Sequence, residues 1–481
     1  CKDALWAALG DEPGALGAEA LQRYARAYTV CPFELGLDLS LWSDVIVGDY
    51  NYLFDPVVRL QRFFETRGDY LFLLDEAHNL PARAREMHTA ALAGSAFRDA
   101  RSRLKTALGK VCTHFTAWRR RCEEAAGDRS GKTVFAPDRD EEFDRLLTRL
   151  CDPLEGWLDE HREPDETHAA LLQLYFDVRA WLRVADTFDD HFVLQLSAFG
   201  SEVRATQLCL DPSAFLQADF GRGRAAVLFS ATLGPAAYYK DLCGLPDARA
   251  VALRSPFDPR RLALVCPRRI STRYRDRAAS LEAVAGCLAA MVQARPGNYL
   301  AFFHSYAYLR QVYDVFTAAN PGLETLCQTA EMDEAARAEF LARFAPDPAA
   351  PLLGFAVLGG VFGEGVDLAG DRLIGVAVVG PGLPQVGPRQ EQLREYFEAT
   401  RGSGFDYAYR YPGMNKVLQA AGRVIRTPAD KGVVLLIDDR FTQSDYRRLM
   451  PPHWAGLRTV DTPAQLSALL AEFWGGEEET P

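Results

Sequence analysis

Short runs of hydrophobic residues, separated by polar and turn-forming stretches, recur along most of this chain. A run with apolar side chains at successive positions is typical of a strand that is buried on both faces of a parallel sheet. Helical periodicity between the later runs completes an alternation of strands and helices, which predicts an α/β fold. The predicted strands are residues 45–47, 71–74, 225–229, 300–303, 355–358, 374–379 and 433–437.

Several of these predicted strands end in polar residues. In open α/β sheets, ligands bind at the carboxyl ends of the strands, so polar strand ends are candidate sites by position. The candidates are Asp75-Glu76, Ser230-Ala231-Thr232, His304-Ser305 and Asp438-Asp439.

A stretch of different character separates the strands at 71–74 and 225–229. Residues 81–203 are rich in Ala, Leu, Arg and Glu, and their apolar positions repeat with a helical period. From Asp75 to Ser230 the chain runs 230 − 75 = 155 residues, whereas a strand–helix–strand step needs about thirty. We therefore predict an inserted helical domain, with a polar loop at 127–140 between two of its helices.

Composition limits the class of protein. The 481 residues exceed the size at which one hydrophobic core stops growing, so more than one domain is expected. Hydrophobic residues make up 48% and charged residues 25%, as in ordinary globular proteins. No apolar run is long enough to span a bilayer, and the first residues lack a signal-peptide pattern, which predicts a cytoplasmic protein without a membrane partner. The ten cysteines are scattered singly, and we expect them to be reduced.

The net charge of −11 argues only weakly against nucleic acid, because phosphate binding depends on local Lys and Arg residues. Seven arginines lie between residues 260 and 277, and three more form the run 119–121. These clusters are candidate phosphate contacts. The alternative is that they are solvated surface arginines.

The strand at 71–74 delivers two adjacent carboxylates, Asp75 and Glu76, to its tip. Phosphoryl-transfer enzymes need this arrangement, since one carboxylate holds Mg²⁺ and another group orients or deprotonates the attacking water. Acidic pairs are also common in simple loops, so the interpretation needs support from other motifs.

Three further segments give that support. Ser230-Ala231-Thr232 places small hydroxyl residues at a second strand tip, and the glycine-dense loop 359–368 lets backbone approach phosphate or nucleic acid closely. In the segment 419–426, Arg423 and Arg426 are three residues apart on a predicted helical face, where they could stabilise charge on a γ-phosphate. Taken singly, these segments could be a helix N-cap, a tight turn and a surface arginine pair.

At these residues the sequence resembles the XPD/DinG family of superfamily-two DNA helicases. The resemblance covers nearly the whole chain, with the motifs in the family's order. Asp75 to His78 resembles motif II, Ser230 to Thr232 motif III, Tyr299 to Tyr306 motif IV, Gly363 to Asp367 motif V and Gln419 to Arg426 motif VI, while Asp49 to Pro56 resembles a further family segment.

The resemblance implies an α/β fold with two RecA-like P-loop NTPase motor domains, the first incomplete, and an inserted α-helical Arch domain. Residues 1–35 would be a remnant of an iron–sulfur domain, and 81–203 the Arch domain. The first motor domain would comprise 36–80 and 204–248, and the second 249–481.

The resemblance also implies roles for individual residues. Asp75 would hold Mg²⁺, Glu76 would orient or activate water, and His78 and Thr232 would transmit the nucleotide state. The expected catalytic residues are Asp75, Glu76, His78, Gln419, Arg423 and Arg426; the nucleotide-binding residues are Gly363, Glu364, Asp367 and Gly422; the coupling residues are Ser230, Ala231 and Thr232; and the hypothetical DNA contacts are Arg254, Arg268 and His304.

The same resemblance also predicts an iron–sulfur cluster. Cys31-Pro32-Phe33-Glu34 is similar to the segment with the last of four cysteine ligands of the family's [4Fe-4S] cluster, and thiolates are the usual ligands of such clusters. The other three ligands are expected upstream of Cys1, which lies in a helical pattern and is not itself assigned as a ligand. The alternative for Cys31 is a lone buried cysteine.

No G-x-x-x-x-G-K-[ST] phosphate loop occurs in the sequence. The nearest string, Gly127 to Thr133, has too few residues between its glycines and follows a helical pattern, whereas the motif requires a preceding strand. We expect the true loop upstream of Cys1, so that these residues alone would bind ATP poorly.

The predicted function is an ATP-dependent DNA helicase that moves along single-stranded DNA and unwinds forked duplexes, 5′ to 3′ by resemblance, in repair or replication. One alternative is a DNA-stimulated ATPase that remodels protein–DNA complexes without unwinding. The other is a nucleic-acid-binding fragment without ATPase activity. The oligomeric state stays open, a monomer included.

Overall fold

The computed structural model describes residues 2–11, 14–125, 132–163, 165–360, 362, 368 and 370–476. The chain divides into two compact units, Cys1–Thr66 and Arg67–Pro481. No helix among the described residues is both long and apolar enough to cross a membrane.

The first unit is helical. Helices α1 (Lys2–Asp11), α2 (Ala18–Tyr28) and α3 (Pro32–Ser40) are followed by the short helices α4 (Asn51–Phe54) and α5 (Gln61–Phe64). The first three pack around a small core, and Arg62 of α5 forms exposed ion pairs with two acids of α3. Exposed pairs of this kind contribute little, so the core holds the unit together. The core residues are Ala4, Ala8, Tyr24, Leu35 and Leu39.

The strand predicted at 45–47 is wrong. Val45, Ile46 and Val47 lie in a segment without regular secondary structure, with 78%, 54% and 93% of their surface exposed. A strand requires hydrogen-bonded neighbours as well as apolar side chains. This run pairs with no described strand.

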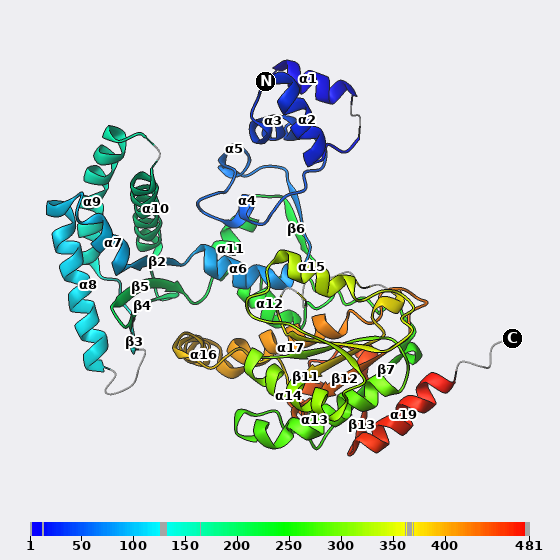
Figure 1. The fold of residues 1–481 in the computed structure, drawn as a ribbon. Coiled ribbons are helices and arrows are strands. Elements are labelled where there is room, and N and C mark those ends of the chain that lie inside the picture. The colour runs from blue at the N-terminus through cyan, green and yellow to red at the C-terminus, as the bar shows by residue number, and fades with distance from the viewer. Residues whose placement is uncertain are drawn as a thin grey trace. The chain divides into compact units, whose positions relative to one another are not determined.

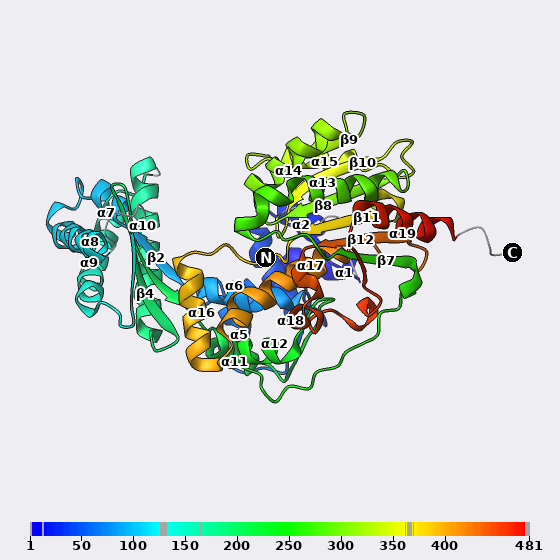
Figure 2. The same ribbon diagram turned by 90° about the horizontal axis from the view of Figure 1, so that it is seen from below.

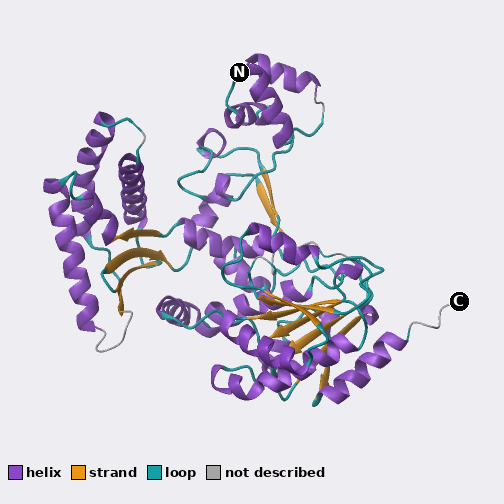
Figure 3. Ribbon diagram, in the orientation of Figure 1, coloured by secondary structure: helices purple, strands orange, loops and turns teal. Residues whose placement is uncertain are grey.

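The largest sheet of the second unit has seven strands, all paired in parallel, in the order β13-β7-β12-β11-β8-β10-β9. Figure 3 shows it in orange. The strands predicted from 300 onward are confirmed, whereas β7, β9 and β13 were not predicted; β9 and β13 are short edge strands. The bounds are β7 Leu262–Pro267, β8 Asn298–Phe303, β9 Glu324–Cys327, β10 Leu352–Val357, β11 Gly375–Val379, β12 Gly432–Ile437 and β13 Arg458–Val460.

Helices cover both faces of this sheet (Figures 1 and 2). On one face α13 (Arg277–Gln293), α14 (Tyr306–Ala319) and α19 (Pro463–Gly475) pack on a core that contains Phe303. On the other, α15 (Glu334–Ala342) and α17 (Tyr411–Ala421) pack on a core that contains Phe302. Successive residues of β8 therefore enter opposite cores, which is why the run is continuously apolar.

The strands predicted at 71–74 and 225–229 are confirmed as parallel strands, but the burial predicted for them is wrong, because Leu71, Leu73 and Val227 are exposed. β1 (Leu71–Leu74) and β6 (Ala225–Leu228) pair in parallel, with Leu74 opposite Leu228. Because their carboxyl ends coincide, the acids after β1 and the hydroxyl residues after β6 lie at one edge. Flanking elements are α6 (Leu80–Met87), α11 (Ser213–Phe220) and α12 (Ala236–Leu242).

The inserted segment is present but is not purely helical. Beside helices α7 (Gly94–Ala100), α8 (Lys105–Ala125), α9 (Glu141–Glu160) and α10 (Glu166–Thr187), it holds an antiparallel sheet of order β2-β5-β4-β3. The strands are β2 (Ala90–Ala93), β3 (Lys132–Ala136), β4 (Phe192–Phe199) and β5 (Glu202–Cys209).

The hairpin of β4 and β5 turns at Gly200, whose φ of 56° suits glycine. The sequence pattern that indicates a strand here is the alternation of apolar residues, since every second residue of β4 enters the insertion's core. These residues are Leu194, Leu196 and Ala198. The boundary predicted at 203/204 falls inside β5. The finer division into domains stays a prediction.

The nearest string to a phosphate loop lies between α8 and β3, with Gly127 to Gly131 outside the described residues. A phosphate loop connects a strand to a following helix, so this order is reversed. The order of the flanking elements supports the interpretation of the string as a decoy, which stays a prediction for the residues outside the described part of the chain.

Substitution of Gly432 tests how closely the large sheet is packed. A Cβ there would lie 2.2 Å from a Val424 methyl carbon and 2.7 Å from the Ile374 carbonyl oxygen, which cannot move without disturbing β11. Gly432→Ala should therefore lower the free energy of unfolding by about 1–3 kcal/mol. The control is Gly456→Ala, because no atom lies within 4 Å of that Cβ position. Equal unfolding free energies for the two variants in denaturant titrations would contradict this account.

Candidate active site

The acidic tip of β1 is exposed and sharply turned. Asp75 accepts a hydrogen bond from the backbone N–H of Glu76 at 2.7 Å, and Glu76 adopts a left-handed conformation with φ 47°. The next backbone N–H, of Ala77, donates to the Phe229 carbonyl at the end of β6. This turn presents both carboxylates at the sheet edge, and strained backbone of this kind is typical of functional sites.

A chain of side-chain hydrogen bonds begins at Glu76. The Ser230 hydroxyl donates to the Glu76 carboxylate at 3.1 Å, so its oxygen is left to accept from His78 Nδ1 at 2.8 Å and from the Thr232 backbone N–H at 3.2 Å. His78 is buried. The structure thus brings Ser230 to Glu76 and His78, which lie 154 and 152 positions away from it in the sequence.

The other ring nitrogen of His78 contacts the domain of the large sheet. Gln419, on α17, hydrogen-bonds His78 Nε2 through its side-chain nitrogen. Since Nδ1 donates to Ser230, Nε2 is the acceptor, and Gln419 donates. Hydrogen bonds therefore run in one direction, from Gln419 through His78 and Ser230 to Glu76.

Ala231 is exposed, whereas Thr232 is buried. The Thr232 hydroxyl oxygen makes no hydrogen bond within the described part of the chain. Leaving such a group unsatisfied is costly, so this hydroxyl is available to a partner outside the described residues.

The helical face predicted for Arg423 and Arg426 is wrong. Helix α17 ends at Ala421, with Gly422 as its C-cap, so both arginines follow the helix. The Asp430 carboxylate accepts hydrogen bonds from the backbone N–H groups of Arg426 and Thr427 and holds the chain in a turn. Both arginines are half-buried.

The predicted motif V residues Gly363, Glu364 and Asp367 lie outside the described residues. Phe362 is described and is fully buried in the core beside Phe340. Gly359, just after β10, has a φ of 73°, as expected for a glycine-dependent turn.

Asp438, a candidate by its position at a strand tip, serves a structural role. It is fully buried, and its two oxygens accept hydrogen bonds from Arg440 at 2.7 and 2.9 Å and from the Thr272 hydroxyl at 2.5 Å. Burial raises the pKa of Asp438, but the hydrogen bonds and charge of Arg440 outweigh it, so the pKa lies below its usual value. An internal ion pair therefore occupies this strand tip.

His304 lies at the tip of β8 and is half-buried. Desolvation, together with the nearby charge of Arg277, lowers the pKa of His304 to about 4. Its Nε2 is buried and makes no hydrogen bond to a described residue. At neutral pH the ring is uncharged, so a DNA contact here would be a hydrogen bond rather than an ion pair.

Most of the arginine cluster is already paired. Arg268 and Arg269 share Asp461, at 2.8 and 3.0 Å, and Arg273 pairs with Asp439 at 2.7 Å. Arg260 pairs with Asp258. Arg254 is exposed in a segment without regular secondary structure. The local excess of positive charge is therefore smaller than the sequence indicated, and the DNA-contact assignments stay predictions.

Cys31 is exposed and is the N-cap of α3. Its thiol is therefore accessible, and the assignment as a cluster ligand stays a prediction. The alternative of a buried cysteine is wrong, but in the described part of the first unit Cys31 is the one cysteine present.

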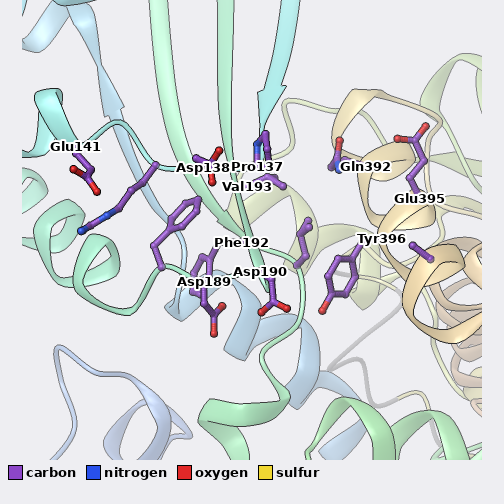
Figure 4. A pocket seen from close by; sticks show the side chains of 14 residues that line it. Pro137, Asp138, Glu141, Asp189, Asp190, Phe192, Val193, Gln392, Glu395 and Tyr396 are labelled. Atoms are coloured by element: carbon purple, nitrogen blue, oxygen red, sulfur yellow. The ribbon is translucent and has the colours of Figure 1, made fainter.

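A cavity of about 800 Å³ lies away from these strand tips (Figure 4). The insertion contributes Asp138, Asp189 and Asp190 to its wall, and α16 (Pro388–Arg401) contributes Glu395 and Tyr396. Its lining is rich in carboxylates, so it does not suit a phosphate-bearing ligand.

Sequence reasoning missed several residues that organise this region. Thr272 and Arg440 belong to no motif that the sequence showed, and neither does Arg401. The Arg401 side chain pairs with Asp211 and Asp241, which are 190 and 160 residues away from it in the sequence. Such contacts join segments that only the fold brings together.

Two family sequence models match the chain. The helicase C-terminal domain family, Helicase_C_2, matches residues 288–456, and DEAD_2 matches residues 10–97.

Curated relatives and solved structures are also similar. The helicase subunit XPD of general transcription and DNA repair factor IIH from Dictyostelium discoideum is 21% identical over 91% of this chain and 67% of that protein. The ATP-dependent DNA helicase YoaA of Escherichia coli is 28% identical over 44% of this chain and 31% of that protein. A solved XPD helicase structure, 18% identical, superposes with a TM-score of 0.59 over 92% of this chain and 78% of that one, which shows a shared fold.

The lowered pKa of His304 predicts a pH dependence of stability. The folded pKa of about 4 lies below the ordinary value of 6.5, so the folded state binds fewer protons in this window, and stability falls as pH falls from 6.5 towards 4. The difference in unfolding free energy between the wild type and His304→Gln should shrink or reverse across that window. A pH-independent difference would contradict the assignment of a neutral, desolvated imidazole.

Proposed function

This chain belongs to the XPD/DinG-like family of superfamily-two helicases, which are ATP-dependent DNA helicases, and we propose that it carries the DEAH side of the motor's ATP site. The observation that carries the proposal is the directed hydrogen-bond chain from Gln419 through His78 and Ser230 to Glu76. It joins the first motor domain to the second at the carboxylate that would act on water.

Each residue has a chemical task in this proposal. Asp75 is exposed at the strand tip and has the oxygen ligands that Mg²⁺ prefers. Glu76 accepts a hydrogen bond from the Ser230 hydroxyl through one carboxylate oxygen, which fixes that oxygen while the other can orient water. A bound Mg²⁺–ATP would supply the phosphoryl group and the negative charge. Arg423 and Arg426, in the turn after α17, would stabilise that charge as hydrolysis proceeds.

His78 would couple the state of the bound nucleotide to the position of the second domain. Movement of Glu76 as ATP is bound or hydrolysed changes the Ser230 hydrogen bond, and with it the orientation of an imidazole whose other nitrogen binds Gln419. The unsatisfied Thr232 hydroxyl would find its partner in a second arrangement. A two-state cleft of this kind converts hydrolysis into movement along DNA.

The finer assignments are part of the same proposal. The substrate would be single-stranded and forked DNA, with 5′ to 3′ movement in repair or replication, and Cys31 would be one ligand of a [4Fe-4S] cluster. The site of action would be the cytoplasm, where thiols stay reduced; the described cysteines form no disulfide.

Glu76→Gln in the full-length protein tests the proposed chemistry. The substitution keeps the size of the side chain but removes the carboxylate that orients water, so DNA-stimulated ATP hydrolysis should fall about 100-fold or more. Glu160→Gln, at an exposed position of the insertion, is the control and should match the wild type. Unchanged hydrolysis in Glu76→Gln would refute the assignment of the motor.

A strand-displacement assay on the full-length protein separates unwinding from remodelling. Forked duplexes with only a 5′ or only a 3′ single-stranded tail should show ATP-dependent displacement from the 5′-tailed substrate. Displacement from the 3′-tailed substrate would reverse the proposed direction. Hydrolysis without displacement on either substrate would favour the remodelling ATPase.

A further inference from the structure

Helix α16 lies in sequence between two strands of the large sheet, yet it does not pack on that sheet. Its buried residues Leu393 and Phe397 join a separate cluster, and no residue from 388 to 410 belongs to the two cores of the large sheet. The partners in that cluster come from the insertion and from α12. They are Val193, Leu208, Leu210, Tyr238, Tyr239 and Leu242.

We call residues 388–410 the arm. Its far end is α16, and its near end is a π-helix, Asp406–Arg410, that leads directly into α17. The near end is tied to the large-sheet domain, because Arg410 pairs with Asp445 at 3.2 Å and Arg448 pairs with Asp406 at 3.1 Å. The arm is therefore a second-domain segment whose far end is held by other parts of the molecule.

Arg401, the last residue of α16, makes the polar part of that attachment. Its Nε donates to Asp241 of α12 at 2.7 Å, and a terminal nitrogen donates to Asp211, just after β5, at 3.1 Å. The Asp211 side chain is fully buried. Charged hydrogen bonds to a buried carboxylate are stronger than surface pairs, and losing the guanidinium would leave that charge buried alone.

Aromatic contacts form a further attachment to α12, at the near end of the arm and at the start of α17. The Tyr238 ring of α12 meets the rings of Tyr407 and Tyr411 edge-on, with centroids 5.1 and 5.0 Å apart. Away from these contacts α16 is less completely packed, because its other face lines the cavity shared with the insertion, as Gln392, Glu395 and Tyr396 show in Figure 4. The connection between arm and insertion therefore depends on the apolar cluster and Arg401.

Both attachments of the arm are continuous with the candidate active site. Helix α12 follows the segment of Ser230 and Thr232, and α17 carries Gln419. Helix α6 follows His78, and its Arg85 donates to the Leu210 carbonyl at 3.1 Å, next to Asp211. A change at the His78–Gln419 contact would thus move the near end of the arm against a far end held by Arg401.

We propose that Arg401 is a positioning residue that pins the arm to the first motor domain and to the base of the insertion, so that opening and closing of the motor cleft moves the insertion. This inference rests on the proposed helicase function. Its consequence is that Arg401 governs how much unwinding each hydrolysed ATP produces, while the chemistry at Glu76 continues.

The test compares arginines of one helix in the full-length protein. Arg401→Ala removes the contacts to Asp211 and Asp241, whereas the control Arg394→Ala removes ion pairs only to Glu391 and Glu395 of α16 itself. The measurements are kcat and KM of DNA-stimulated ATP hydrolysis, base pairs unwound per ATP, and the thermal midpoint. We expect Arg401→Ala to lower unwinding per ATP about tenfold with kcat nearly unchanged, and Arg394→Ala to match the wild type.

Two further variants keep the test decisive if Arg401→Ala does not fold. Arg401→Lys should recover part of the unwinding per ATP, and the exchanged pair Arg401→Asp with Asp241→Arg should exceed Arg401→Asp alone. The proposal is overturned if hydrolysis and unwinding fall in proportion, if Arg401→Ala behaves as Arg394→Ala does, or if neither variant gives recovery. A wild-type protein that neither hydrolyses ATP nor unwinds DNA would instead refute the proposed function.

Discussion

One imidazole ring connects the two halves of the candidate active site. His78 uses Nδ1 to donate to Ser230 and Nε2 to accept from Gln419, so neither nitrogen can change partner without disturbing the other domain. Because the ring is buried, water does not replace a lost partner. The Glu76 carboxylate is held at the end of this chain, and its geometry depends on whether the two domains are in contact.

The large sheet supplies the rigid frame against which that contact is made. Its central strands, from β7 to β10 in the sheet order, are buried on both faces, and the Asp438–Arg440 ion pair fixes the loops at its carboxyl edge. Asp438 would be expensive to bury alone, and Arg440 with Thr272 satisfies its oxygens. The rigidity of the sheet matters for the site, because the helix that positions Gln419 beside His78 packs on this sheet.

The arm relates the motor to the insertion. Helices α13, α14, α15, α17 and α19 pack on the large sheet, whereas α16 packs on α12 and the insertion. A segment that begins in one domain and is held by another transmits relative movement, provided that its ends are firmly attached. Arg401, Leu393 and Phe397 attach α16 to α12 and to the insertion, and the ion pairs of the π-helix attach the other end of the arm to the large-sheet domain.

The sequence by itself determined the elements whose signal is local. Apolar runs correctly predicted six strands. Four of them lie in the large sheet and are apolar throughout because both faces are buried, whereas β1 and β6 are apolar but partly exposed. The strand tips with Asp75, Glu76 and Ser230 followed from chain order. The insertion followed from a spacing too long for one helix.

Tertiary structure decided the rest. Val45 to Val47 are apolar but pair with no described strand, and β4 and β5 are strands inside a region of helical composition. Arg423 and Arg426 follow the end of α17, and Asp430 accepts a hydrogen bond from the backbone N–H of Arg426 in the turn beyond it. Only the fold could bring Gln419 to His78 or Arg401 to Asp211, since hydrogen bonds between distant segments leave no periodic trace in a sequence.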